Sequence, residues 1–244
     1  MTATFAAPPA AFAGDPAPNF KKVLAEVDTL GTFEGKDFSC VYTMVSEKPG
    51  EKNSVPQARL FRRDVKDQYT ILILQPEAQK GQGYLRVEDV VWFYDPESRQ
   101  FEKSTMREAL AGTKAQGSDF SRRRFSEDYA VAAWQESTLG VYPVYVLDLT
   151  AVRSDVPYEK ARIWVRKDLS IVLKLEDYSV SGRLMRTSLF PRYAMVDKKY
   201  VPSQMLIVDE LNKGERTQLT LSDPSVAAVP DYVFTKQYLE LVNK

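Results

Sequence analysis

The sequence predicts a mainly β protein with a few helices: a single strongly curved antiparallel sheet of about eleven strands, an unclosed β-barrel whose concave face is plugged by helices. Apolar residues alternate with period two along most of the chain from Phe38 to Ser222, and turn residues interrupt this pattern at hairpin spacing. Strands and helices do not alternate, which argues against a parallel α/β sheet. One amino-terminal helix cannot fill the concave side of so large a sheet, so another segment must help to cover it.

The chain is predicted to consist of a leader over residues 1–18 and one domain over residues 19–244. The leader is rich in Ala and Pro, and Ala11-Phe12-Ala13 before Gly14 has the small-x-small form of a signal-peptidase site. The stretch before this site contains no basic residue, and Pro8-Pro9 interrupts its apolar part. Two interpretations therefore stay open, a signal remnant and a flexible leader.

The domain is predicted to begin with an amphipathic helix over residues 20–30, capped by Asn19 and ended by Gly31. Its apolar face is formed by Phe20, Val23, Leu24, Val27 and Leu30. This face is expected to dock on the sheet. At the other end of the domain, residues 234–241 form a second, short amphipathic piece.

The strands between these helices are separated by turn residues. In the first strand Phe38, Cys40, Tyr42 and Met44 share one face, and Cys40 is most simply a small buried hydrophobic residue. Residues 69–74 are apolar on both faces, which predicts a strand covered on both sides. The expected strands span residues 38–45, 58–63, 69–74, 83–87, 90–94, 99–103, 144–151, 160–166, 171–179, 184–193, 200–210 and 217–222.

Residues 104–136 interrupt the strand pattern and are predicted to form a helical lid. Thr105-Met106-Arg107-Glu108 has the pattern of a capping box, and a second helical piece begins near Ser118. A connection of about 30 residues is longer than usual and is typical of lids or binding segments. Its apolar residues occupy the groove either as a movable lid or as a permanent plug of the core; they are Met106, Leu110, Phe120, Phe125 and Tyr129. The run Arg122–Arg124 is interpreted as a solvated helix face rather than a phosphate site.

A tight turn at Glu88-Asp89 predicts which residues share a face in the hairpin around it. A two-residue turn pairs Val87 with Val90 and Leu85 with Trp92, whereas a three-residue turn shifts this register. We expect this face to line an apolar groove that binds lipid, although ordinary core packing would use the same positions. The candidate groove residues are Leu85, Val87, Val90, Trp92, Tyr94, Ile71 and Ile73.

The composition excludes several classes of chemistry. The chain has no His and one Cys, which rules out a Ser-His-Asp triad, His-ligated zinc, an intrachain disulfide and a Cys-x-x-Cys pair. Lys plus Arg and Asp plus Glu both number 33, so net charge indicates no nucleic-acid partner. The sequence contains no run of 18 apolar residues and therefore predicts no membrane-spanning helix. We therefore expect no catalytic residues, no metal and no cofactor.

Five short motifs in this order carry a resemblance to a known family: Lys80–Arg86, Trp92–Pro96, Gly117–Ser121, Lys199–Ser203 and Pro230–Phe234. Together they resemble the periplasmic outer-membrane lipoprotein-sorting proteins (LolA-like) over roughly residues 20–242. The resemblance implies a half-barrel that carries the acyl chains of lipoproteins or other lipids through the periplasm. It also implies membrane-bound donor and acceptor proteins as partners.

Two other function classes stay open on the same fold. One is a regulatory or lipid-sensing interaction module that is not an enzyme. The other is a carboxylate-based hydrolase, for which the sequence offers no paired motif.

Overall fold

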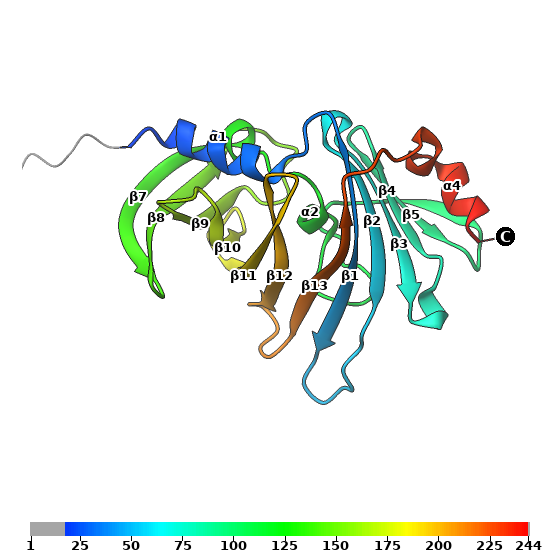
Figure 1. Cartoon of the computed structure of the whole chain (residues 1–244). Coiled ribbons are helices and arrows are strands. Elements are labelled where there is room, and N and C mark those ends of the chain that lie inside the picture. Colours follow the sequence, from blue (N-terminus) through cyan, green and yellow to red (C-terminus); the bar gives the residue numbers. More distant parts are fainter. Residues whose placement is uncertain (1–17, 244) are drawn as a thin grey trace, which may run out of the picture.

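The computed structural model describes residues 18–243 and shows a single curved antiparallel sheet of thirteen strands (Figure 1). The predicted leader therefore lies, apart from Pro18, outside the described residues. The strands are β1 Asp37–Glu47, β2 Gln57–Arg63, β3 Gln68–Gln75, β4 Gly83–Val87, β5 Val90–Asp95, β6 Gln100–Ser104, β7 Tyr129–Leu139, β8 Tyr142–Ala151, β9 Lys160–Arg166, β10 Val172–Tyr178, β11 Leu184–Val196, β12 Lys199–Asp209 and β13 Arg216–Ser225. The α-helices are α1 Phe20–Gly31, α2 Gly117–Phe120, α3 Phe125–Asp128 and α4 Lys236–Leu241, and the short 3-10 helix η3 spans Asp231–Phe234. Within residues 18–243, no helix combines the length and the hydropathy of a membrane span.

The strand order explains why the sheet stays open. It runs β6-β5-β4-β3-β2-β1-β13-β12-β11-β10-β9-β8-β7, so the first and last strands of the sequence pair at its centre. Strands β6 and β7 form the two edges and do not pair with each other. The predicted fold class, an unclosed and strongly curved antiparallel sheet, is confirmed.

Two details of the prediction are wrong. There are thirteen strands rather than about eleven, and one of them, β7, occupies residues that were expected in the helical lid. Most residues of β7 are exposed on both faces, so its sequence has no apolar alternation to mark it; pairing with β8 forms it. The capping-box residues Thr105–Glu108 form a turn, in which the Glu108 N–H donates to the Thr105 carbonyl, and not a helix.

The concave face of the sheet carries the main hydrophobic core. Phe38, Cys40, Tyr42 and Met44 point into it and are all buried, as their alternation in β1 predicts. Burial also raises the pKa of the Cys40 thiol to about 12, so this Cys is an inert core residue. Helix α1 adds its apolar face to the same core, and the Asn19 side chain caps the helix by accepting from the Lys22 N–H.

In the described part of the chain, η3 and α4 lie outside the sheet and cover the convex face over β2 to β5 (Figure 1). Leu239 of α4 is fully buried against this face. Gly83 permits the contact, because a Cβ atom at this position would lie 2.5 Å from Leu239 Cδ2. Strand β3 is therefore covered on both sides as predicted, with Ile71 on the inner side and Thr70 donating to the Val233 carbonyl on the outer side.

Candidate functional site

Residues 105–128, here called the lid segment, connect the two edge strands β6 and β7. Because these edges lie at opposite ends of the sheet, the connection has to cross the open concave side. Figure 1 shows its helix α2 enclosed by the curved sheet. The lid segment contains only two four-residue helices, α2 and α3, and otherwise consists of turns and irregular chain.

Apolar side chains of the lid segment fill the middle of the concave face. Leu110, Phe120 and Phe125 are buried members of the main core, and the ring centroid of Phe120 lies 5.2 Å from that of Tyr42 in an edge-on contact. Met106 is half-buried against the same core, as is Tyr129, the first residue of β7. The structure thus brings all five predicted lid residues onto the inner face.

A buried ionic cluster joins the lid segment to the sheet. The Asp119 carboxylate of α2 lies 2.8 Å from the Arg186 guanidinium of β11, and both side chains are only 5% exposed. A second carboxylate, Asp177 of β10, lies 3.6 Å from Arg186 Nε. Burial raises the pKa of Asp177 to about 6 even though Arg186 opposes this effect. Arg186 therefore has two possible counterions, one on the lid segment and one on the sheet.

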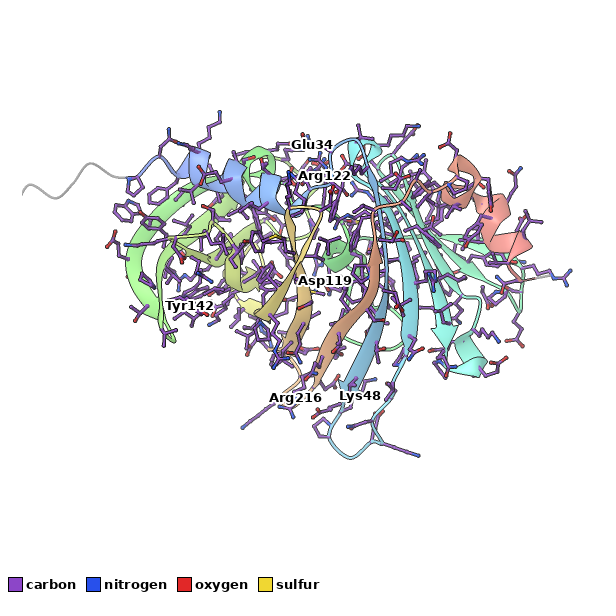
Figure 2. The ribbon with its side chains drawn as sticks, in the orientation of Figure 1. Glu34, Lys48, Asp119, Arg122, Tyr142 and Arg216 are labelled. Carbon is purple, nitrogen blue, oxygen red and sulfur yellow. The ribbon has the colours of Figure 1, made fainter. Side chains whose placement is uncertain are left out.

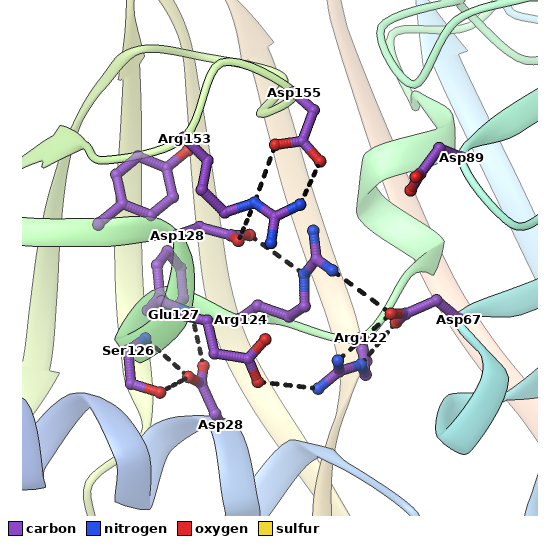
Figure 3. A network of polar contacts seen from close by, with 12 residues as sticks. Asp28, Asp67, Asp89, Arg122, Arg124, Ser126, Glu127, Asp128, Arg153 and Asp155 are labelled. Atoms are coloured by element: carbon purple, nitrogen blue, oxygen red, sulfur yellow. Dashed lines mark hydrogen bonds and ion pairs between the residues drawn. The ribbon is translucent and has the colours of Figure 1, made fainter.

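A second polar network holds the end of the lid segment against α1 and against Asp67, the residue before β3 (Figure 3). The Asp28 carboxylate of α1 accepts hydrogen bonds of 2.8 Å from the backbone N–H groups of Phe125 and Ser126. Arg122 and Arg124 both pair with Asp67, at 2.6 and 3.3 Å. The expected solvated face at Arg122–Arg124 is corrected: these residues lie between α2 and α3, and two of the three are partly buried in ion pairs.

The lid segment forms the shared wall of two small cavities. An apolar one, of about 80 Å³, lies under α1 and against β10, β11 and β12. A more polar one, of about 70 Å³, lies toward β9 and the β8–β9 loop. Both are lined by Asp119, Ser121, Arg123, Phe125 and Leu175. The remaining apolar and aromatic lining of the first cavity comes from Val27, Leu30, Tyr42, Ile171, Val172, Phe190, Tyr193, Tyr200, Val201, Pro202 and Met205.

The predicted groove residues do not lie on one face. The hairpin register is as expected, with Leu85 opposite Trp92 and Val87 opposite Val90. However, Leu85 and Tyr94 are buried with Leu239 on the convex side, where Val87 and Trp92 also pack, and Val90 is half-buried across from Val87.

Only Ile71 and Ile73 of the predicted groove set belong to the inner core. In the ladder Ile71 pairs with Tyr84 and Thr70 with Leu85, so the Leu85 side faces outward under α4. None of the seven predicted groove residues lines the apolar cavity.

Sequence reasoning missed the residues that do line the cavity and the ionic cluster beside it. Leu175, Phe190 and Met205 lie in strands that were predicted, but their convergence depends on the strand order, which the sequence pattern does not show. Asp177 and Arg186 break the apolar face of β10 and β11, and this interruption was the available signal. Among the described residues, no group of His, Cys, Asp and Glu is arranged to hold a metal ion.

Comparisons with known proteins find a matching family model and solved structures of the same fold. A family model whose description reads "Uncharacterized protein" matches residues 65–241. The structure of a LolA superfamily protein from Nitrosomonas europaea has a TM-score of 0.79 and 25% identity, and the match covers 91% of this chain and 100% of that one. No curated protein sequence matches the chain.

Two further solved structures show the same fold. One, described as an outer membrane lipoprotein-sorting domain from Vibrio parahaemolyticus, is 21% identical with a TM-score of 0.79 and covers 90% of this chain and 97% of its own. The other, a DUF1329 family protein from Desulfovibrio piger, is 19% identical with the same TM-score and the same coverage, 90% and 97%.

Proposed function

We propose that this chain, whose structure resembles that of a LolA superfamily protein, is a periplasmic carrier for the acyl chains of lipoproteins or other lipids. The carrier is not an enzyme and uses no cofactor. It takes cargo from one membrane-bound protein and delivers it to another. The single observation that supports the proposal most strongly is a concave apolar face that the protein covers with its own lid segment.

The cavity volume supports a lid that moves. An apolar space of about 80 Å³ is well below the roughly 300–1,000 Å³ of typical ligand pockets, so it cannot hold an acyl chain as it stands. The lid side chains Phe120 and Phe125 occupy the neighbouring volume. An acyl chain that displaces Phe120 and Phe125 contacts the same apolar surface. The lid side chains and the acyl chain therefore compete for one face of the sheet.

Energetics explain why a carrier benefits from such competition. Burial of a methylene is worth about 0.8 kcal/mol, so an acyl chain of about 15 methylenes gains roughly 12 kcal/mol if fully buried. If each acyl chain of the cargo contributed an affinity of that size, the carrier could not release its cargo. Because cargo entry costs the lid its own buried contacts, the net affinity is lower and the lid favours release when it closes again.

The test is to identify what the natively purified protein carries. Gentle purification from the envelope, organic extraction and mass spectrometry should find acyl lipid or lipoprotein in stoichiometric amount. A stable complex with a protein and no lipid would support a regulatory module instead. Turnover of a lipid ester by the purified protein would support a hydrolase, and either result would contradict the carrier proposal.

A further inference from the structure

We propose that Arg123 is an anion-binding residue at the rim of the apolar cavity and that the cargo is an amphiphile with an acyl chain and an anionic headgroup. The inference rests on the proposed function and narrows its ligand class. It does not concern the chain-binding surface itself, which any apolar cargo would use. What it adds is a charge requirement at one position.

Arg123 is the cation of the cavity wall that has no ion-pair partner among the residues that the structure describes. The other arginine lining the apolar cavity, Arg62, lies 2.7 Å from Asp64. The one carboxylate in this lining, Asp119, is paired with Arg186 at 2.8 Å. Once these pairs are assigned, the cavity lining keeps one positive charge, on Arg123.

The two sequence neighbours of Arg123 show how unusual this is. Arg122 and Arg124 are both committed to Asp67, and Arg124 also pairs with Asp128 at 3.3 Å. Arg123 instead lines both cavities, and its guanidinium carbon lies 5.8 Å from the centre of the Phe125 ring. Within the described chain it makes neither a hydrogen bond nor an ion pair through its side chain.

The position of this charge defines the kind of ligand. Arg123 is half-buried, so it lies at the boundary between water and the apolar lining. There it faces the Phe125 ring and lowers the pKa of Asp177 in the polar cavity, but it forms no ion pair. A guanidinium binds carboxylates and phosphates with paired hydrogen bonds. A headgroup at Arg123 leaves its acyl chain pointing along Leu175, Phe190 and Met205. The carboxylate of a fatty acid and the phosphate of a lysophospholipid share the required chemistry.

The first experiment compares two pairs of ligands with the same acyl chain, and within each pair one ligand carries a net negative charge and the other carries none. Binding of oleate, methyl oleate, oleoyl lysophosphatidylglycerol and oleoyl lysophosphatidylcholine is measured on the full chain by displacement of a fluorescent lipid. We expect oleate to bind about tenfold or more tightly than methyl oleate, since a charge-assisted hydrogen bond is worth more than the neutral contact it replaces. Tighter oleate binding assigns the site to a carboxylate, and tighter lysophosphatidylglycerol binding assigns it to a phosphate.

The second experiment tests whether Arg123 is the origin of this preference. Arg123→Gln should weaken binding of the anionic ligands about tenfold and leave methyl oleate unchanged, and Arg123→Lys should restore part of the loss. The matched control is Arg183→Gln, which removes an exposed Arg from the β10–β11 turn, away from both cavities.

Equal affinity for oleate and methyl oleate, or an anion preference that survives in Arg123→Gln, overturns the inference. In that case, tight binding of methyl oleate leaves the carrier proposal intact. If none of the four lipids binds wild-type protein, the proposed function fails as well.

Discussion

Arg186 is a cation buried inside a hydrophobic half-barrel, and its two carboxylate neighbours have different roles. Asp119 comes from the lid segment and Asp177 from the adjacent strand. In the proposed open state Asp119 leaves the core with the lid segment, but Asp177 stays beside Arg186. The second carboxylate lowers the cost of lid opening, because a buried charge without any counterion is strongly unfavourable.

The Asp119 substitution tests this division of roles. Asp119→Asn keeps an oxygen that can accept from the Gln116 N–H but removes the charge opposite Arg186. Breaking a buried ion pair typically costs about 3–5 kcal/mol in free energy of unfolding, and we expect a smaller loss here because Asp177 remains. Urea unfolding of Asp119→Asn, Asp177→Asn and the double variant measures it. If the two carboxylates share the role of counterion, the double variant should lose more free energy of unfolding than the two single variants lose together. A loss equal to or smaller than that sum would contradict the shared-counterion account.

The pKa of Asp177 predicts a pH dependence with a defined sign. Burial raises this pKa from 3.8 to about 6, so the folded state binds more protons than the unfolded state between these values. The resulting contribution to stability is complete below pH 3.8 and is lost as the pH rises through about 6. Its size is at most about 3 kcal/mol.

Asp177→Asn removes this titration and serves as the reference for measuring it. The free energy of unfolding of Asp177→Asn minus that of wild type should increase between pH 4.5 and pH 8, because only the wild type has to bury a carboxylate at high pH. Carboxyl groups with lowered pKa values, such as Asp37, act in the opposite direction in both proteins and cancel in the difference. A difference that does not change with pH would show that Asp177 has an ordinary pKa.

Helix α3 is too short to be stable alone, and α1 holds it in place. Its first N–H groups donate to Asp28, which lies on α1 and is not part of the lid segment. Burial raises the pKa of Asp28 in spite of these hydrogen bonds from Ser126 and Phe125. The carboxylate therefore couples the position of α1 to that of the lid segment.

The Asp28→Ala variant should release the end of the lid segment. Loss of a helix cap costs about 0.5–2 kcal/mol, and we expect faster amide hydrogen exchange over residues 121–128 with little change in β1 or β13. Lys21→Ala on the exposed side of α1 is the control. Exchange that stays unchanged over residues 121–128 would mean that Asp28 does not hold α3.

At the scale of elements, sequence patterns predicted most strands and one face of the lid segment. Strands β4 and β9 have the predicted bounds, and Asn19 caps α1 as expected, because alternation and capping are local signals. Strand β7 was missed because its side chains are exposed on both faces and only its backbone pairing with β8 defines it. Phe120 and Phe125 were predictable as apolar residues within a long connection.

The groove face was not predictable, for a reason that concerns the whole molecule. Hairpin geometry placed Leu85 and Trp92 on one side, but both sides of this hairpin are apolar. The choice between concave and convex is made by α4, which is far away in the sequence and covers the Leu85 side. Likewise, Arg186 and Asp119 are 67 positions apart and meet only after the sheet has curved around α2.

The connectivity of the whole sheet allows the lid segment to move without unfolding it. The two terminal strands β1 and β13 are locked together at the centre, and the lid segment joins only the two free edges. Within the described chain its ties to the sheet are side-chain ion pairs, apolar contacts and a few single hydrogen bonds, rather than a strand ladder. The lid opening that we propose would therefore exchange side-chain contacts and keep the β-ladders intact.

The central claim is that the lid segment and an acyl chain compete for one apolar face, and a pair of variants tests it most directly. Phe120→Ala with Phe125→Ala removes buried contacts from the closed state, each change typically costing about 3–5 kcal/mol, whereas Leu85→Ala removes a buried side chain from the convex cluster. For each variant, two quantities are measured: the affinity for a fluorescent fatty acid and the melting temperature. Both variants should melt at lower temperature, but only the Phe120/Phe125 variant should bind more tightly than wild type, since its open population rises. If it melts lower and binds no better than Leu85→Ala, the lid segment is a permanent part of the core and the competition does not exist.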